Sequence, residues 1–156
     1  MEHSHDPRTA YHEAGHAVVA LVHDRPVRFV SVLPSRDYLG LCGLGKGVFR
    51  PTKDWLEQEI LISLAGMAAE ARHSGEYARG AAERDLRYVR RLAVQRAGEF
   101  QAERLERRLL AKVENLLADD EVWAAVEKIV VELLLRGEIS GRTARHLYDQ
   151  CFNANT

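Results

Sequence analysis

The sequence predicts a mainly α-helical (α+β) fold, in which one helix and one small sheet near the N-terminus precede a helical bundle. Apolar residues recur at helical spacing over residues 9–23 and over most of the chain after residue 54. A short alternating segment rich in β-branched residues and a glycine-rich segment lie between them. The 156 residues suit one domain, 1–156, because a chain of this length buries enough surface to form its own core.

The first predicted helix begins after an N-cap at Thr9 and ends near His23. Its apolar face consists of Tyr11, Ala14, Ala17, Val18, Leu21 and Val22. Pro26 ends this helix, and the alternation over Val27–Leu33 predicts a strand. The four glycines between Tyr38 and Val48 predict a tightly turning strand at a sheet edge.

From Asp54 the chain is predicted to be helical to its end. Asp54 would cap a helix that runs toward Gly75. The helices expected after it are Glu83 to Ala97, Glu103 to Leu117, Asp119 or Asp120 to Gly137, and Ser140 to Phe152.

The composition gives no reason to expect nucleic acid or a membrane as a partner. The net charge of −1 gives no electrostatic reason to expect nucleic acid or an anionic membrane. Arginine clusters are interleaved with acidic residues, which favours solvated helix faces; they include Arg84, Arg87, Arg90 and Arg91. The most apolar stretches, 60–71 and 122–135, are shorter than a bilayer span, so we expect no membrane insertion.

Cysteine usage and the N-terminal sequence predict a cytoplasmic protein. Cys42 and Cys151 are too few and too far apart in sequence for a disulfide framework, and reduced thiols are typical of the cytosol. The first sixteen residues contain no apolar core of the kind that a signal peptide has.

The string His12-Glu13-Ala14-Gly15-His16 (HExxH) carries the strongest chemical signal. Histidines four residues apart on a helix project from one face, close enough to bind one metal ion. Glu13 lies beside that face, where its carboxylate would act as the general base on a zinc-activated water. The sequence therefore predicts one catalytic Zn2+ per chain, held by His12 and His16.

A catalytic zinc site usually has a third protein ligand, and the spacing does not identify it. The acidic candidates downstream are Glu57, Glu59, Glu70, Glu76, Glu83 and Asp85. Glu70 lies among apolar residues and would need a buried partner. Asp85 lies at the start of a predicted helix after a Gly/Ala loop. These residue-level arguments leave both open.

Three segments together resemble the peptidase domain of the FtsH-type AAA+ zinc proteases. HEAGHAVVA at residues 12–20 is similar to the metal-binding helix of that family. VSVLPSRDYLGLCG at 30–43 resembles its strand-and-glycine segment, and LAGMAAEARHSGEYARGAAERDL at 64–86 resembles its "AGR-x-AEE … GA-x-NDL" segment. The later helices fit its helical C-terminal part, so the resemblance covers nearly the whole chain.

The resemblance implies roles for individual residues. His12 and His16 correspond to the zinc-binding histidines, Glu13 to the general base and Asp85 to the third zinc ligand. Glu70 corresponds to the first Glu of "AEE", which suggests that it contacts a ligand histidine. The glycine segment would bind extended substrate through Gly40, Leu41, Cys42 and Gly43.

The sequence also departs from the family pattern. It contains no Walker A string and no membrane anchor, and Met67 and Arg84 replace the Arg of "AGR" and the Asn of "NDL". We therefore expect a peptidase domain without its own ATPase, acting on peptides or unfolded polypeptide segments. A separate ATPase would deliver folded substrates, and an oligomer is compatible with the resemblance.

Two alternative functions remain at this level. A peptidase-like fold that binds peptides or a partner without cutting would account for the absent ATPase and for Arg84 beside a ligand. A purely structural zinc site would use four Cys and His ligands, and neither cysteine is suitably placed. The preferred interpretation is a zinc-dependent endopeptidase.

Overall fold

The computed structural model describes residues 5–33, 42–44, 52–78 and 83–153. Within these ranges the chain forms six helices and three short strands, which confirms the mainly α fold with one small sheet. Their order is α1 Pro7–Val22, β1 Val27–Ser31, β2 Cys42–Leu44, α2 Lys53–Ser74, α3 Glu83–Ala97, α4 Ala102–Ala118, α5 Asp120–Arg136, β3 Glu138–Ser140 and α6 Gly141–Asn153. None of the described helices has the length and apolar character needed to cross a membrane.

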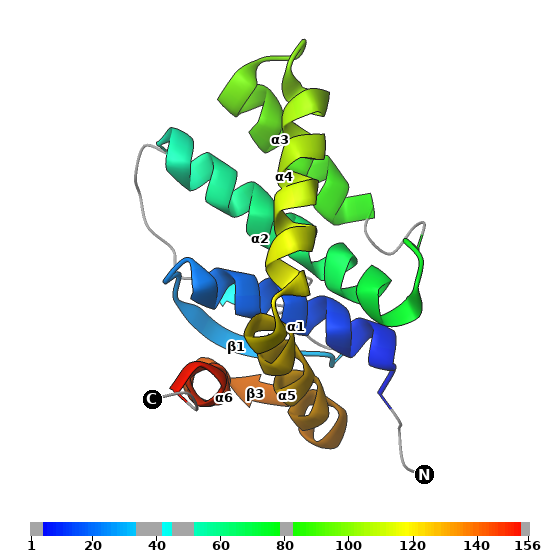
Figure 1. Cartoon of the computed structure of the whole chain (residues 1–156), viewed down its shortest axis with the longest axis vertical. Coiled ribbons are helices and arrows are strands. Elements are labelled where there is room, and N and C mark those ends of the chain that lie inside the picture. The colour runs from blue at the N-terminus through cyan, green and yellow to red at the C-terminus, as the bar shows by residue number, and fades with distance from the viewer. Residues whose placement is uncertain (1–4, 34–41, 45–51, 79–82, 154–156) are drawn as a thin grey trace.

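Helix α1 lies at the centre of the molecule, with α2 along one side and α5 and β1 against others (Figure 1). Its residues from His12 to Leu21 are all buried, rather than only the apolar face that periodicity predicted. A helix covered on all sides needs small or apolar residues throughout, and α1 supplies alanines and valines. The buried polar residues in it are therefore conspicuous: His12, Glu13 and His16.

Two glycines allow α1 and α2 to approach closely. A Cβ atom on Gly15 of α1 would lie 2.5 Å from the carbonyl oxygen of Ala65 in α2. A Cβ atom on Gly66 of α2 would lie 2.5 Å from Nε2 of His16 and 2.7 Å from Nε2 of His12. Both distances are too short for real carbon contacts, so the absence of side chains at these positions permits the packing.

The sheet has the strand order β2-β1-β3, and both pairs are antiparallel. Strand β3 was not predicted, because residues 138–140 are only three residues between two helices and carry no alternating pattern long enough to recognise. Its pairing sets Val30 opposite Ile139, both of which are buried in the core. The predicted strand Val27–Leu33 is two residues too long, since β1 ends at Ser31.

Two predicted caps were wrong by a few residues. Asp6, not Thr9, caps α1: its carboxylate accepts a hydrogen bond from the Arg8 amide at 3.0 Å, and Pro7 begins the helix. Thr52, not Asp54, caps α2 by accepting from the Trp55 amide at 3.1 Å. In both cases two residues of a type that caps helices lie close together in sequence, and the earlier one forms the cap.

The other helix boundaries agree with the sequence predictions to within one residue. Asp119 caps α5 by accepting from the amides of Glu121 and Val122. Ser140 accepts from the Thr143 amide at the start of α6. Helix α3 begins at Glu83, as predicted, and α3 and α4 form a helical hairpin that extends away from α1 (Figure 1).

A buried ion pair ties α3 to α2 and to the turn after α1. Glu59 of α2 accepts from the Arg25 guanidinium at 2.8 Å and from the Tyr88 hydroxyl at 3.0 Å. The Arg25 guanidinium also lies 5.0 Å from the ring centre of Trp55. Tyr88 is one helical turn after Asp85, so this network fixes the turn of α3 that carries the candidate ligand.

We expect Glu59→Ala to destabilise the protein by about 3 kcal/mol, because it leaves the Arg25 charge buried without its partner. Urea unfolding followed by circular dichroism measures the loss. The control is Glu132→Ala, which breaks a pair with Arg136 whose side chain is 67% exposed, and should cost less than about 1 kcal/mol. Equal losses in the two variants would contradict a structural role for the buried pair.

Candidate metal centre

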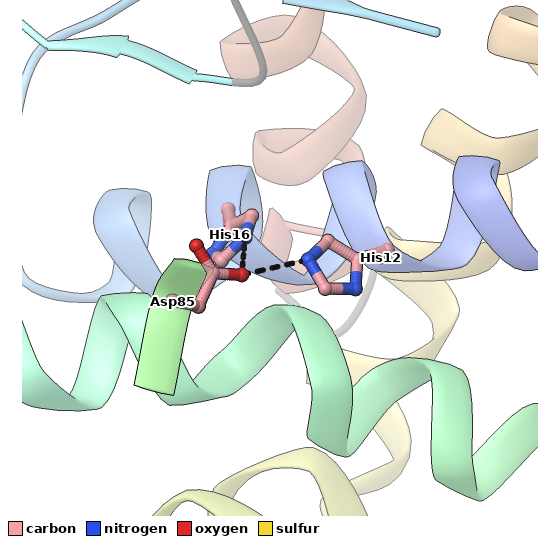
Figure 2. A group of neighbouring side chains, drawn as sticks. All are labelled: His12, His16 and Asp85. Atoms are coloured by element: carbon pink, nitrogen blue, oxygen red, sulfur yellow. Dashed lines mark hydrogen bonds and ion pairs between the residues drawn. The ribbon is translucent and has the colours of Figure 1, made fainter. Parts of the chain in front are cut away.

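Three potential metal ligands from two helices converge on one point. His12 and His16 project from α1, and Asp85 reaches them from the first turn of α3 (Figure 2). The Asp85 Oδ2 atom lies 2.8 Å from Nε2 of His12 and 3.2 Å from Nε2 of His16. Among the described residues these three form a cluster whose ligand atoms all lie within 4.8 Å of one another.

The second nitrogen of each imidazole is held by a hydrogen bond on the far side of the ring. Nδ1 of His16 donates to the Ile62 carbonyl oxygen at 2.7 Å. Nδ1 of His12 donates to the Glu70 carboxylate at 3.1 Å. Because both Nδ1 atoms are engaged in these bonds, the Nε2 atom of each ring is the one that faces the Asp85 carboxylate. Such outer contacts fix the tautomer and orientation of metal-binding histidines.

These residues fit a zinc ion. Tetrahedral coordination with bonds of about 2.0–2.1 Å separates neighbouring ligand atoms by about 3.4 Å. The contact of Asp85 with His16, at 3.2 Å, is near that separation, and the contact with His12, at 2.8 Å, is shorter. Nε2 of His16 is also fully enclosed yet has no hydrogen bond within the described part of the chain, because its 3.2 Å contact with Asp85 is poorly aligned. An enclosed nitrogen with a free lone pair is what a metal ligand requires.

The charges around the histidines also suit a cation. Burial alone lowers the pKa of His12, but the hydrogen bonds and charges of Asp85 and Glu70 outweigh it and raise the pKa to about 9. Burial alone raises the pKa of Asp85, and the two histidines hold it well below its usual range. Two carboxylates that stabilise a proton on His12 would also stabilise a metal ion in its place.

Glu13 is buried beside the histidines, with 3% of its surface exposed. Its Oε2 atom has no hydrogen-bond partner among the residues that the structure describes. Burial raises the pKa of Glu13 to about 8, opposed by His16 and reinforced by Asp85. A carboxylate with a pKa near neutrality and a free oxygen has the properties of a general base.

The other acidic candidates lie away from this point. Glu57 is paired with Arg96 and Arg108, and Glu59 with Arg25 and Tyr88. Glu76 and Glu83 are exposed. The structure thus brings Asp85 to both histidines and Glu70 to one of them.

The predicted substrate segment is described only in part. Gly40 and Leu41 lie outside the described residues. Cys42 and Gly43 belong to β2, which forms one edge of the sheet in the described ranges. Two features close to the histidines were not predicted: the Ile62 carbonyl, because any residue supplies a carbonyl, and Gly66, whose signal was its run of small neighbours in sequence.

Comparison with known proteins assigns the chain to a protein family. The model of peptidase family M41 matches residues 1–122. The chain belongs to this family. An ATP-dependent zinc metalloprotease FtsH of Pirellula staleyi is 38% identical over 109 residues, which cover 64% of this chain and 15% of that protein. A mitochondrial inner membrane m-AAA protease component, AFG3L1 of Mus musculus, is 35% identical over 103 residues, or 64% of this chain and 13% of that protein.

These matches confirm the resemblance to FtsH-type peptidase domains. A further FtsH zinc metalloprotease, of Ruminiclostridium cellulolyticum, is 39% identical over 99 residues, or 57% of this M41 chain and 15% of that protein. The M41 chain therefore corresponds to a small part of each of these relatives. His12, Glu13, His16 and Asp85 all lie within the span that matches the family model.

Proposed function

We propose that this M41 chain is a zinc-dependent endopeptidase that hydrolyses peptide bonds in peptides or unfolded polypeptide segments. The observation that supports it most directly is the convergence of His12 Nε2, His16 Nε2 and Asp85 Oδ2 beside the buried carboxylate of Glu13. His12, His16 and Asp85 would hold the ion, and a fourth position would be left for water or substrate.

Each residue has a distinct role in this proposal. When bound, zinc supplies Lewis acidity, which lowers the pKa of a water molecule to about 7 and polarises a carbonyl group. Glu13 takes the proton of the attacking water and returns it to the departing amine nitrogen. Glu70 and the Ile62 carbonyl keep the imidazoles in place and prevent their Nδ1 atoms from acting as ligands.

We expect substrate to lie along the edge of the sheet. Strand β2 pairs with β1 on one side, and an extended peptide that adds to its other side would form main-chain hydrogen bonds. Gly40, Leu41, Cys42 and Gly43 would provide these contacts. Since the relatives are named ATP-dependent, we also propose that an ATPase, on the same or a separate chain, supplies unfolded segments.

We expect Asp85→Ala to abolish stoichiometric zinc binding, because it removes one of three protein ligands. Glu70→Ala should lower zinc affinity by about 10–100-fold, as loss of an outer partner of a ligand histidine typically does. Competition with a chromophoric chelator measures both. Glu76→Ala, at an exposed acidic position, is the control and should bind zinc normally. Full zinc binding by Asp85→Ala would disprove the ligand assignment.

Degradation of unfolded casein tests the function itself. The zinc-loaded chain should produce fragments, and a zinc chelator should stop this until zinc is restored. A second outcome is that zinc-loaded protein immobilised on a column binds casein and later releases it uncut. In that case the alternative, a module that binds peptides without cutting them, replaces the proposal. The same assay with an added ATPase partner and a folded substrate tests the proposal that an ATPase supplies unfolded segments to this chain.

A further inference from the structure

A hollow on the surface of α3 begins at the turn that carries Asp85. Its volume is about 570 Å³, and the described residues that line it are all arginines: Arg84, Arg87, Arg90 and Arg91. We call these four residues the arginine hollow. Their side chains are exposed, so an incoming molecule meets guanidinium groups first.

Two of these arginines have charges that no carboxylate neutralises within the described residues. Arg90 forms two hydrogen bonds with Glu106, at 2.7 and 2.8 Å, and is neutralised by it. Arg87 and Arg91 form no ion pair with any described residue, and the Arg91 guanidinium lies 5.6 Å from the ring centre of Tyr88. Within the described residues, the hollow therefore carries positive charge that no ion pair compensates.

The hollow begins one residue before Asp85 in sequence and follows α3 from there. Arg84, Arg87 and Arg91 are spaced i, i+3 and i+7, which places them on one side of α3. Arg91 is six residues after Asp85, or about 9 Å along the helix axis. An extended peptide covers about 3.3 Å per residue, so this distance corresponds to roughly three substrate residues.

We propose that the arginine hollow binds a carboxylate of the peptide substrate, so that the chain prefers acidic residues about two to four positions from the cleaved bond. This inference rests on the proposed peptidase function. Guanidinium groups bind carboxylates through paired hydrogen bonds, and Arg87 and Arg91 have no such partner among the residues that the structure describes. A carboxylate at the C-terminus of a peptide would offer the same chemistry.

Peptide binding to zinc-loaded Glu13→Gln protein tests the proposal, because binding is measured without cleavage. Four fluorescent decapeptides are compared by anisotropy: neutral and amidated, glutamate-containing and amidated, lysine-containing and amidated, and neutral with a free C-terminus. We expect the glutamate peptide to bind about fivefold more tightly than the neutral one, as two exposed charge pairs would give. The preference should decrease in 0.5 M NaCl.

The double variant Arg87→Gln/Arg91→Gln, made in the same background, should lose the preference. The matched control is Arg107→Gln on α4, an arginine that is 72% exposed and 3.8 Å from Glu103, and it should keep the preference. Equal binding of the glutamate and neutral amidated peptides, or a preference that survives the double variant, would overturn the proposal. Tighter binding of only the neutral peptide with a free C-terminus would identify the terminal carboxylate as the ligand.

Cleavage of the same peptides by the unsubstituted chain separates this inference from the proposed function. If all peptides are cut at equal rates, the peptidase function holds and the acidic preference is wrong. If none is cut while the glutamate peptide still binds most tightly, the hollow recognises carboxylates and the catalytic proposal fails.

Discussion

Glu13→Gln is expected to bind zinc as the unsubstituted chain does and to hydrolyse peptides about 10²- to 10⁴-fold more slowly. Glutamine has the same shape as glutamate but cannot accept a proton at neutral pH. The buried side chain should keep its place, since its Oε2 atom has no hydrogen-bond partner in the described part of the chain to lose. The defect should therefore lie in catalysis and not in folding or metal binding.

Initial rates on a quenched fluorescent peptide, with zinc content measured on the same samples, provide the test. Glu103→Gln is the control, because that side chain is 71% exposed on α4 and far in sequence from the metal centre. It should cleave at the normal rate. A normal rate for Glu13→Gln would show that another group takes the proton from water.

The same variant should change the pH dependence of stability in zinc-free protein. Burial raises the pKa of Glu13 to about 8 from an ordinary value of 4.5, so the folded state holds this proton more tightly than the unfolded state. Glu13 therefore favours the folded state most below pH 4.5, and this contribution is lost as the pH rises to about 8. Between pH 4.5 and 8, the free energy of unfolding of Glu13→Gln should therefore decrease less than that of the unsubstituted chain. Urea unfolding at several pH values measures this difference.

Gly66→Ala is expected to lower zinc affinity by about 100-fold or more. The added Cβ atom would lie 2.5 Å from Nε2 of His16 and 2.7 Å from Nε2 of His12, the two atoms that face Asp85. The imidazoles cannot simply rotate away, because Ile62 and Glu70 hold their Nδ1 atoms. Alanine is a better helix former than glycine by about 1 kcal/mol, so helix propensity does not explain a loss.

Zinc affinity, from competition with a chelator, and helix content, from circular dichroism, measure this effect. The control on the same helix is Gly75→Ala at the C-cap, where a Cβ atom meets nothing within 4 Å but the backbone has a φ of 91°. That variant should lose about 1 kcal/mol of stability and keep its zinc. Normal zinc affinity in Gly66→Ala would mean that α1 and α2 can separate without disturbing the ligands.

Part of this site could be predicted from local sequence and part could not. The i, i+4 spacing of His12 and His16 follows from helix geometry, and Glu70 stood out as a carboxylate among apolar residues. Asp85 could be chosen as the third ligand only through the family resemblance. Its position beside the histidines depends on how α3 packs against α2, and its spacing from His16 in sequence does not reveal that packing. The Ile62 carbonyl has no side-chain signature at all.

The fold shows the same division. Helix boundaries at Gly75, Gly98 and Gly137 were predictable because a glycine with positive φ ends each helix, whichever element packs against it. Strand β3 was not predictable, since three residues become a strand only through pairing with β1. The burial of α1 on all sides from His12 to Leu21 was also missed, because its alanines and valines give little periodic contrast.

The pairing of β1 with β3 joins residues 27–31 to residues 138–140, so the sheet is completed only when two segments far apart in sequence meet. The candidate metal centre has the same character, because His12 and Asp85 are 73 residues apart in sequence. Contacts between such distant segments form slowly, because a long loop must close first. The cluster of His12, His16 and Asp85 therefore depends on long-range packing, since it is complete only once α3 has packed against α2 and brought Asp85 to the histidines.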